Sequence, residues 1–208
     1  MLVGLMIIAC LPSQDRVDGE QITSPDGRRS AYVADRSTDG WSTVYLREGR
    51  KTRDLLPGDV SGKLGSSGMR RIQVGVWLKN DELSFQYHCG TGCVSIYKIN
   101  VDTGTMVELW TGAVDYGVYW SPRRDRALVG THLGGLLMIS SEGAYTTEVL
   151  GCRVFNYKTT GGMYLFESWS QDGANVLVRK VTCDDREALP SKGERLRWDG
   201  NNFSLPIQ

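Results

Sequence analysis

Four cysteines and one histidine have the spacing that most clearly permits chemistry. Cys89 and Cys93 are separated by Gly-Thr-Gly, the composition of a tight turn, and His88 precedes them. Positions that face each other across a hairpin approach closely enough for a disulfide, so we predict a Cys89–Cys93 bond. If Cys10, the fifth cysteine, is engaged otherwise, Cys152 and Cys183 would then remain to pair with each other. Two disulfides would suit an oxidising compartment such as a bacterial cell envelope.

Two alternatives for these residues stay open at this stage. His88, Cys89 and Cys93 could offer three ligands to a zinc ion, although zinc sites normally show two spaced ligand pairs and no second pair is present. The cysteines could also be free thiols of a cytosolic protein. We favour the disulfides, and we expect neither a metal nor another cofactor.

Residues for acid, base or nucleophilic catalysis form no recognisable motif. The chain has two histidines, His88 and His132, and no serine lies in a Gly-x-Ser-x-Gly sequence. Nothing in the sequence brings Asp115 close to the Asp184-Asp185 pair. We therefore expect a protein without catalytic residues, and an enzyme is the less favoured interpretation.

The composition indicates one all-β domain. The chain has 208 residues, with 25 Gly, 6 Trp and 9 Tyr, which is long enough for a sizeable core and rich in turn formers and aromatics. Lys and Arg total 24 and Asp and Glu total 24, so no net charge favours nucleic acid or a membrane surface. We expect no nucleic-acid partner.

A repeated sequence pattern organises the chain. An apolar strand ends in Trp or Thr, a polar turn such as Ser-Pro-Asp-Gly follows, and a second strand begins at once. The marker residue is Thr23, Trp77, Trp120 or Trp169, at intervals of 54, 43 and 49 residues. Propeller blades span about 40–50 residues, so each interval fits one blade.

This pattern resembles the repeat of TolB-like and dipeptidyl-peptidase-type β-propellers, in which it marks the passage from the first to the second strand of a blade. The resemblance implies about four antiparallel blades in an incomplete or distorted ring; a β-sandwich is the alternative. The predicted strands are 20–23, 30–34, 42–47 and 52–56; 72–77, 83–88, 94–99 and 105–109; 116–120, 126–131, 136–140 and 145–150; 163–169, 176–181, 195–198 and 203–205. We predict a short insertion at 151–162 before the fourth blade.

The first residues differ from the rest of the chain. Residues 1–9 are uncharged and apolar, and Ile7-Ile8-Ala9-Cys10 resembles the lipobox of bacterial lipoproteins. That resemblance implies a signal at 1–10 with lipidation of Cys10, a polar tether at 11–19 and a single domain at 20–208. Leu11 after the cysteine would favour the outer membrane. A buried first strand, or a translation start placed too late, is the alternative.

These features lead to three functional hypotheses. The first is a non-catalytic envelope lipoprotein that binds a protein partner through propeller loops, as an accessory subunit or a toxin-immunity protein, and touches the membrane through its lipid alone. We expect Trp41, Arg123 and Arg124 to contact that partner, because exposed aromatic and arginine side chains dominate binding energies. The second is an envelope hydrolase acting on a peptide or glycan in the propeller funnel. The third is a cytosolic scaffold.

Overall fold

The computed structural model describes residues 21–35, 42–56, 72–90, 92–144, 151–155, 158–160, 162–183, 194–198 and 203–204. These residues form sixteen strands and one 3-10 turn at His132–Gly134. The fold is therefore all-β, as the turn-rich composition predicts. Within this part of the chain no helix is long and apolar enough to cross a membrane.

The strands pair antiparallel with their sequence neighbours. The first sheet contains β1 (Ile22–Thr23), β2 (Arg29–Asp35), β3 (Ser42–Glu48) and β4 (Lys51–Asp54). The second contains β5 (Ile72–Trp77), β6 (Glu82–Gly90), β7 (Cys93–Asn100), β8 (Met106–Trp120), β9 (Arg126–Thr131) and β10 (Gly135–Ser140). A hairpin of β11 (Arg153–Phe155) and β12 (Lys158–Thr160) precedes a last sheet of β13 (Gly162–Trp169), β14 (Val176–Thr182), β15 (Glu194–Trp198) and β16 (Phe203–Ser204).

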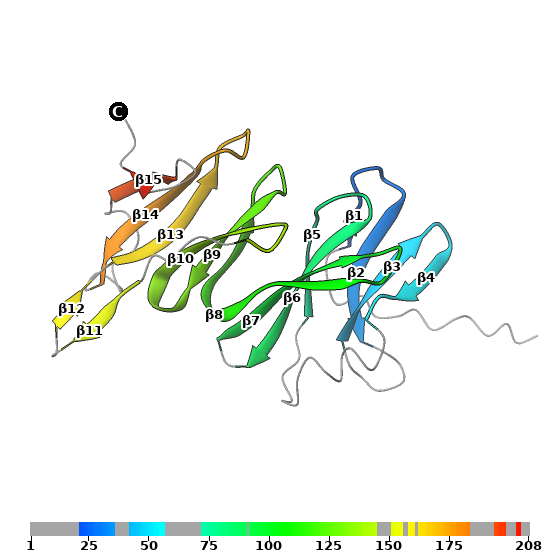
Figure 1. Cartoon of the computed structure of the whole chain (residues 1–208), viewed down its shortest axis with the longest axis horizontal. Coiled ribbons are helices and arrows are strands. Elements are labelled where there is room, and N and C mark those ends of the chain that lie inside the picture. The colour runs from blue at the N-terminus through cyan, green and yellow to red at the C-terminus, as the bar shows by residue number, and fades with distance from the viewer. Residues whose placement is uncertain are drawn as a thin grey trace, which may run out of the picture.

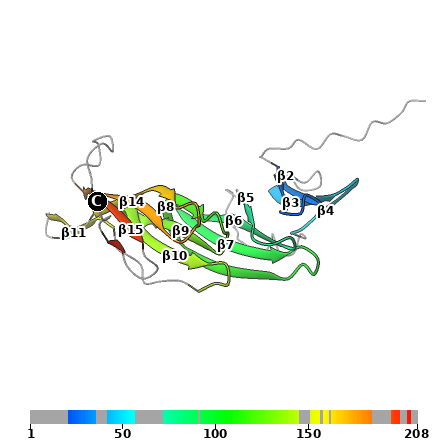
Figure 2. The same ribbon diagram turned by 90° about the horizontal axis from the view of Figure 1, so that it is seen from above.

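The sheets correspond to four blades. Blade 1 is β1–β4, blade 2 is β5–β7 with the first half of β8, blade 3 is the second half of β8 with β9 and β10, and blade 4 is β13–β16. They stand in a row in chain order, with blades 1 and 4 at opposite ends in both views (Figures 1 and 2). The described sheets thus form an open row of propeller blades.

Strand β8 differs from the prediction. We expected separate strands at 105–109 and 116–120, whereas one strand of 15 residues pairs with β7 up to Ala113 and with β9 from Val114 onward. The register is irregular between Val114 and Gly117, and Gly117 has a φ of +106° that glycine tolerates without strain. The chain therefore passes directly from blade 2 to blade 3 without a loop, and the irregularity before Gly117 marks the change of partner strand.

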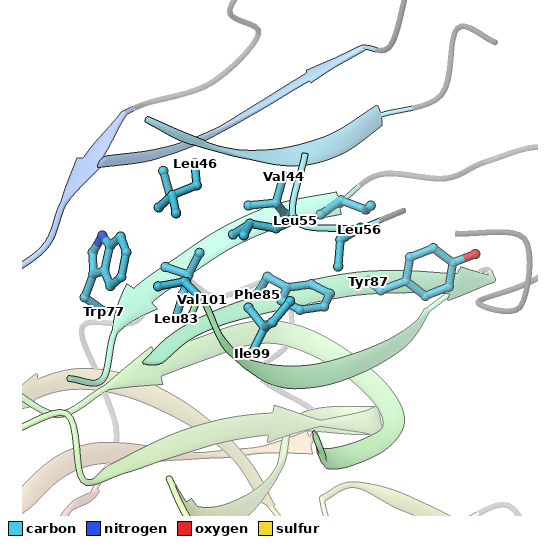
Figure 3. Packing of buried hydrophobic residues seen from close by; sticks show 12 residues of the cluster. Val44, Leu46, Leu55, Leu56, Trp77, Leu83, Phe85, Tyr87, Ile99 and Val101 are labelled. Atoms are coloured by element: carbon cyan, nitrogen blue, oxygen red, sulfur yellow. The ribbon is translucent and has the colours of Figure 1, made fainter. Parts of the chain in front are cut away.

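Apolar side chains fill the space between consecutive blades. Alternation along β2 and β3 directs Ala31, Val44 and Leu46 toward blade 2, where they pack with Leu83 and Phe85 (Figure 3). Similar clusters join blade 2 to blade 3 and blade 3 to blade 4. Burial of these side chains is the main force that holds the blades together.

The repeated tryptophans link neighbouring blades. The indole N–H of Trp77 donates to the carbonyl of Ile22 in blade 1 at 3.2 Å, and that of Trp169 donates to the carbonyl of Tyr119 in blade 3 at 3.1 Å. The matching acceptor for Trp120 would be the carbonyl of Val76, which instead accepts from the Ser84 hydroxyl. Accordingly, the buried Trp120 N–H has no partner within the described part of the chain.

Both predicted disulfides are present. Cys89–Cys93 joins the adjoining ends of β6 and β7, with 5.1 Å between the Cα atoms. Cys152–Cys183 joins the segment before β11 to the end of β14, with 5.6 Å between the Cα atoms. The predicted insertion is the β11–β12 hairpin, so the second disulfide fixes this insertion to blade 4.

Candidate functional site

The turns between the first and second strands of the blades lie along one edge of the molecule. They follow β1, β5, the second half of β8 and β13, and all four are at the upper edge of Figure 1. The turns between third and fourth strands, such as 49–50 after β3, leave the same ends of the strands. We call this surface the turn face. It is the candidate site because it gathers the exposed charged residues of several blades.

The first and fourth turns have the same pattern of hydrogen bonds. The Ser24 hydroxyl donates to Asp26 Oδ1 at 2.7 Å, and the Ser170 hydroxyl donates to Asp172 Oδ1 at 2.6 Å. The Ser24 and Ser170 hydroxyls also accept backbone N–H groups five residues further on. The serine hydroxyl, followed by a backbone N–H, lowers the pKa of each aspartate. Two turns 146 residues apart thus confirm the repeat.

The third turn replaces Asp-Gly by Arg-Arg. Arg124 occupies the position of Gly27 and Gly173 and has a φ of +63°, close to their +72° and +67°. Such a conformation costs a non-glycine residue about 1–2 kcal/mol. The half-buried Arg124 guanidinium donates from Nη1 to the carbonyl of Trp77 in blade 2 at 2.9 Å. This bond across the blades offsets the backbone cost.

We predict that two substitutions at Arg124 differ in their effect on stability. Arg124→Gly loses the bond to Trp77 but relieves the backbone, so the free energy of unfolding should change by less than about 1 kcal/mol. Arg124→Ala loses the bond and keeps the strain, so it should be less stable than the glycine variant by about 1 kcal/mol. Urea denaturation of both variants measures this. An alanine variant as stable as the glycine variant would show that the positive φ carries no cost.

Arg123 occupies the position of Asp26 and Asp172, and its side chain is exposed. Its stem lies against Gly173 of blade 4 so closely that a Cβ there would be 3.0 Å from Arg123 Cγ. The Arg123 charge also contributes to the lowered pKa of Asp172, after the Ser170 hydroxyl and the Ala174 N–H. The stem is therefore held between two blades while the guanidinium faces solvent, as a binding residue requires.

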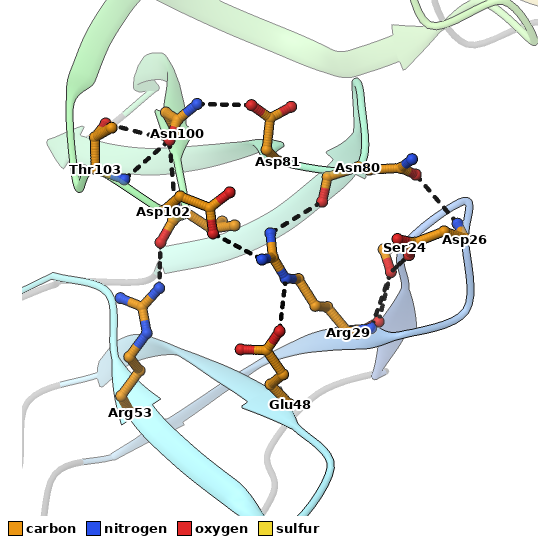
Figure 4. A network of polar contacts seen from close by, with 11 residues as sticks. Ser24, Asp26, Arg29, Glu48, Arg53, Asn80, Asp81, Asn100, Asp102 and Thr103 are labelled. Carbon is orange, nitrogen blue, oxygen red and sulfur yellow. Dashed lines mark hydrogen bonds and ion pairs between the residues drawn. The ribbon is translucent and has the colours of Figure 1, made fainter.

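A polar network joins the turn faces of blades 1 and 2 (Figure 4). Arg29 donates to Asp102 at 2.7 Å, to Glu48 at 3.3 Å and to the carbonyl of Asn80 at 3.5 Å. The hydrogen bond to Asp102 is the main cause of the raised pKa of Arg29. The Asp26 N–H also donates to Asn80 Oδ1 at 3.1 Å. These bonds fix the two turns relative to each other.

A second charged group joins blades 2 and 3. Lys98 contacts Glu142 at 2.8 Å, and this hydrogen bond is the main cause of the lowered pKa of Glu142. Lys79 contacts Glu82 at 2.9 Å and lies 3.7 Å from Glu142. The turn face is consequently a continuous polar surface whose side chains are held by neighbouring blades.

The serine and histidine side chains lie at different ends of the blades. The serine hydroxyls of the first and fourth turns bond to aspartates, whereas His88 lies near the far end of β6 and His132 begins the 3-10 turn that follows β9. Among the described residues, no group of three histidine, cysteine or acidic side chains could hold a metal ion. Cys89 and Cys93, the possible zinc ligands, are oxidised to a disulfide.

The structure places the predicted contact residues as follows. Arg123 and Arg124 lie on the turn face, Arg123 exposed and Arg124 bonded to blade 2. Trp41 and Cys10 lie outside the described residues. The described residues that flank the Trp41 segment, Asp35 and Ser42, lie at the ends of β2 and β3 remote from the turn face.

Sequence reasoning missed the Arg29 network. Asp102, its closest partner, is 73 residues away along the chain, so no local pattern reveals the contact. The adjacent Arg28-Arg29 pair beside a predicted turn was the available signal.

Solved structures of similar fold include a putative TolB and a β-propeller domain. The putative TolB from Agrobacterium tumefaciens superimposes with a TM-score of 0.50 and 16% identity over 91% of this chain and 64% of that one. The β-propeller domain of the trilobed protease from Pyrococcus furiosus gives 0.52, with 11% identity over 90% of this chain and 57% of that one. The acylaminoacyl peptidase from Pyrococcus horikoshii gives 0.51, with 10% identity over 91% and 32% of the respective chains.

The chain therefore has the TolB-like β-propeller fold that its repeats predict. It spans less than two thirds of the length of each of these structures. No family model and no curated protein matches the sequence. At such low identity the similarity defines the fold and leaves the function to the residues of the site.

Proposed function

We propose that this protein is a non-catalytic lipoprotein of a bacterial cell envelope that binds a protein partner through the loops of its propeller scaffold. The partner-binding role is that of an accessory subunit of an envelope complex or of a toxin-immunity protein. The lipid on Cys10 is the only membrane attachment, and the outer membrane is the expected site.

The turn face is the observation that carries this proposal. Its charged side chains are held by bonds across the blades, such as Arg29 to Asp102 and Lys98 to Glu142. A surface fixed before binding loses little side-chain entropy on association. Arg123 adds an exposed guanidinium with a packed stem, and arginine is enriched among residues that dominate interfaces. Two disulfides support an oxidising compartment.

A hydrolase acting on a peptide or glycan is the alternative function. Peptidases occur among the proteins of similar fold, but this chain covers 32% of the acylaminoacyl peptidase. The similarity is one of fold and is no evidence for peptidase activity in this chain. The hydroxyls of Ser24 and Ser170 are engaged by aspartates, which is the arrangement of a turn.

Lipidation is directly testable at the N-terminus. We expect mass spectrometry of protein from its native host to find an N-terminal peptide that begins at an acylated Cys10. Cys10→Ser should abolish acylation and release the protein from membranes, while its unfolding midpoint stays unchanged because the predicted tether carries no core residues. A native protein that retains Met1 would refute the anchor.

Trp41 is expected to contribute most to partner binding, as a contact separate from the turn face, because Asp35 and Ser42, which flank its segment, lie at the opposite ends of β2 and β3. Once a partner is isolated, Trp41→Ala should weaken binding by about 2 kcal/mol, roughly a thirtyfold rise in Kd measured by titration calorimetry. Thr52→Ala, at an exposed position of β4, provides a control that should retain the affinity. If Trp41→Ala leaves the affinity unchanged but lowers the thermal midpoint, Trp41 packs in the domain and the contact lies elsewhere.

A further inference from the structure

We infer that the turn-face end of blade 1, formed by Arg28, Arg50 and Lys51, binds an acidic segment of the protein partner. This inference rests on the proposed function and adds the chemistry of the partner. It also locates a contact that is separate from Trp41, Arg123 and Arg124.

The strand register brings these three cations together. Arg29 faces Glu48 in the β2–β3 ladder, and Glu48 faces Lys51 in the β3–β4 ladder. Arg28 immediately precedes this row, and Arg50 lies in the two-residue turn that closes it. All three residues are exposed, and none of their side chains has a hydrogen bond or ion pair within the described part of the chain.

The neighbouring carboxylates are already engaged. Arg29 forms ion pairs with Glu48 at 3.3 Å and with Asp102 at 2.7 Å, and Figure 4 shows both contacts. The Asp26 carboxylate accepts from the Ser24 hydroxyl and the Arg28 N–H. Asp54 accepts from the Thr43 hydroxyl and the Leu56 N–H. The described residues of blade 1 nevertheless carry more positive than negative side chains: Arg28, Arg29, Arg47, Arg50, Lys51 and Arg53 against Asp26, Asp35, Glu48 and Asp54. This excess of positive charge favours an anionic ligand.

The size and surroundings of this patch favour a short acidic segment. Bilayers and nucleic acids present anions over a broad surface, and binding them requires many cations side by side. Here exposed acids flank the patch, with side-chain exposures of 58% for Glu48 and 53% for Asp102, and Glu142 is 67% exposed further along the same face. These acids would repel an extended anionic surface. A peptide with two or three carboxylates would meet fewer of these acids than an extended surface.

Titration with a hexaglutamate peptide tests the inference on the folded chain. Two-dimensional NMR at low salt should show amide shifts centred on Arg28, Arg50 and Lys51 that saturate with peptide and shrink as salt is added. Arg50→Gln/Lys51→Gln should raise the Kd about fivefold, as expected for the loss of two exposed charge contacts. A hexalysine peptide should produce no shifts there.

A variant of equal charge separates a local contact from a net-charge effect. Gln73→Glu/Gln171→Glu also lowers the net charge by two, by adding two carboxylates at exposed positions outside blade 1, and should retain the wild-type Kd. Equal weakening in both double variants would overturn the inference. So would the absence of binding, shifts centred on the Arg123 turn, or binding to vesicles containing phosphatidylglycerol without binding to hexaglutamate.

The native partner separates this inference from the proposed function. A partner bound equally well by wild type and by Arg50→Gln/Lys51→Gln would overturn the inference and leave the proposed function standing. Hexaglutamate binding at this patch without any envelope protein partner would uphold the patch as a carboxylate site and overturn the proposed function.

Discussion

Removing the Cys152–Cys183 disulfide should lower the free energy of unfolding by about 3.5 kcal/mol. The bond closes a loop over a sequence separation of 31 residues, and a larger loop restricts the unfolded chain more strongly. It also lies in a buried cluster with Met163 and Val181, so its loss disturbs packing on blade 4. Urea denaturation of Cys152→Ala/Cys183→Ala measures the change.

The other disulfide provides the matched control. Cys89–Cys93 spans four residues, so Cys89→Ala/Cys93→Ala should cost at most about 2 kcal/mol. If both double variants lose the same stability, loop closure is not the source of stabilisation. If Cys152→Ala/Cys183→Ala is as stable as wild type, the disulfide does not hold the β11–β12 hairpin to blade 4.

Trp77→Ala should destabilise the protein by about 3–5 kcal/mol, because it leaves a large cavity between blades 1 and 2. The Trp77 side chain is 1% exposed and lies in the cluster with Leu46 and Leu83. Trp77→Phe keeps most of this contact but loses the bond to the Ile22 carbonyl, so it should cost less than the alanine variant.

Thermal and urea unfolding of the two Trp77 variants measure the difference. Equal losses for phenylalanine and alanine would assign the stability to the hydrogen bond. Retention of wild-type stability by Trp77→Ala would contradict the packing of blade 1 on blade 2.

The sequence predicts the blades well because each repeat carries its own local signals. Tight turns such as Ser24–Gly27 fix the first hairpin of a blade, and alternation fixes the faces of the next strands. The disulfides were also predictable, because the Cys89 hairpin is local and, with Cys10 assigned to the lipid, Cys152 and Cys183 are the remaining pair. The fusion of two expected strands into β8 was not, since residues 110–115 carry no pattern that distinguishes a loop from an extended crossing.

The site was less predictable because its contacts join distant parts of the chain. The bond from the Arg124 guanidinium to the carbonyl of Trp77, 47 residues earlier, was not predictable. Every residue carries a backbone carbonyl, so the type of the accepting residue does not reveal such a bond. Arg123 remains a candidate contact, since its position opposite Gly173 leaves the guanidinium exposed.

Affinity capture from detergent-solubilised envelopes tests the central claim most directly. Wild-type protein and the Trp41→Ala/Arg123→Ala variant, each with Cys10 intact, would be isolated from the native host and compared by quantitative mass spectrometry. We expect a defined envelope protein that co-purifies with the wild type in fixed stoichiometry and is lost from a variant of normal folding stability. The same co-purified proteins in both samples, together with hydrolysis of a peptide or glycan that a single carboxylate or histidine substitution abolishes, would contradict the binding function.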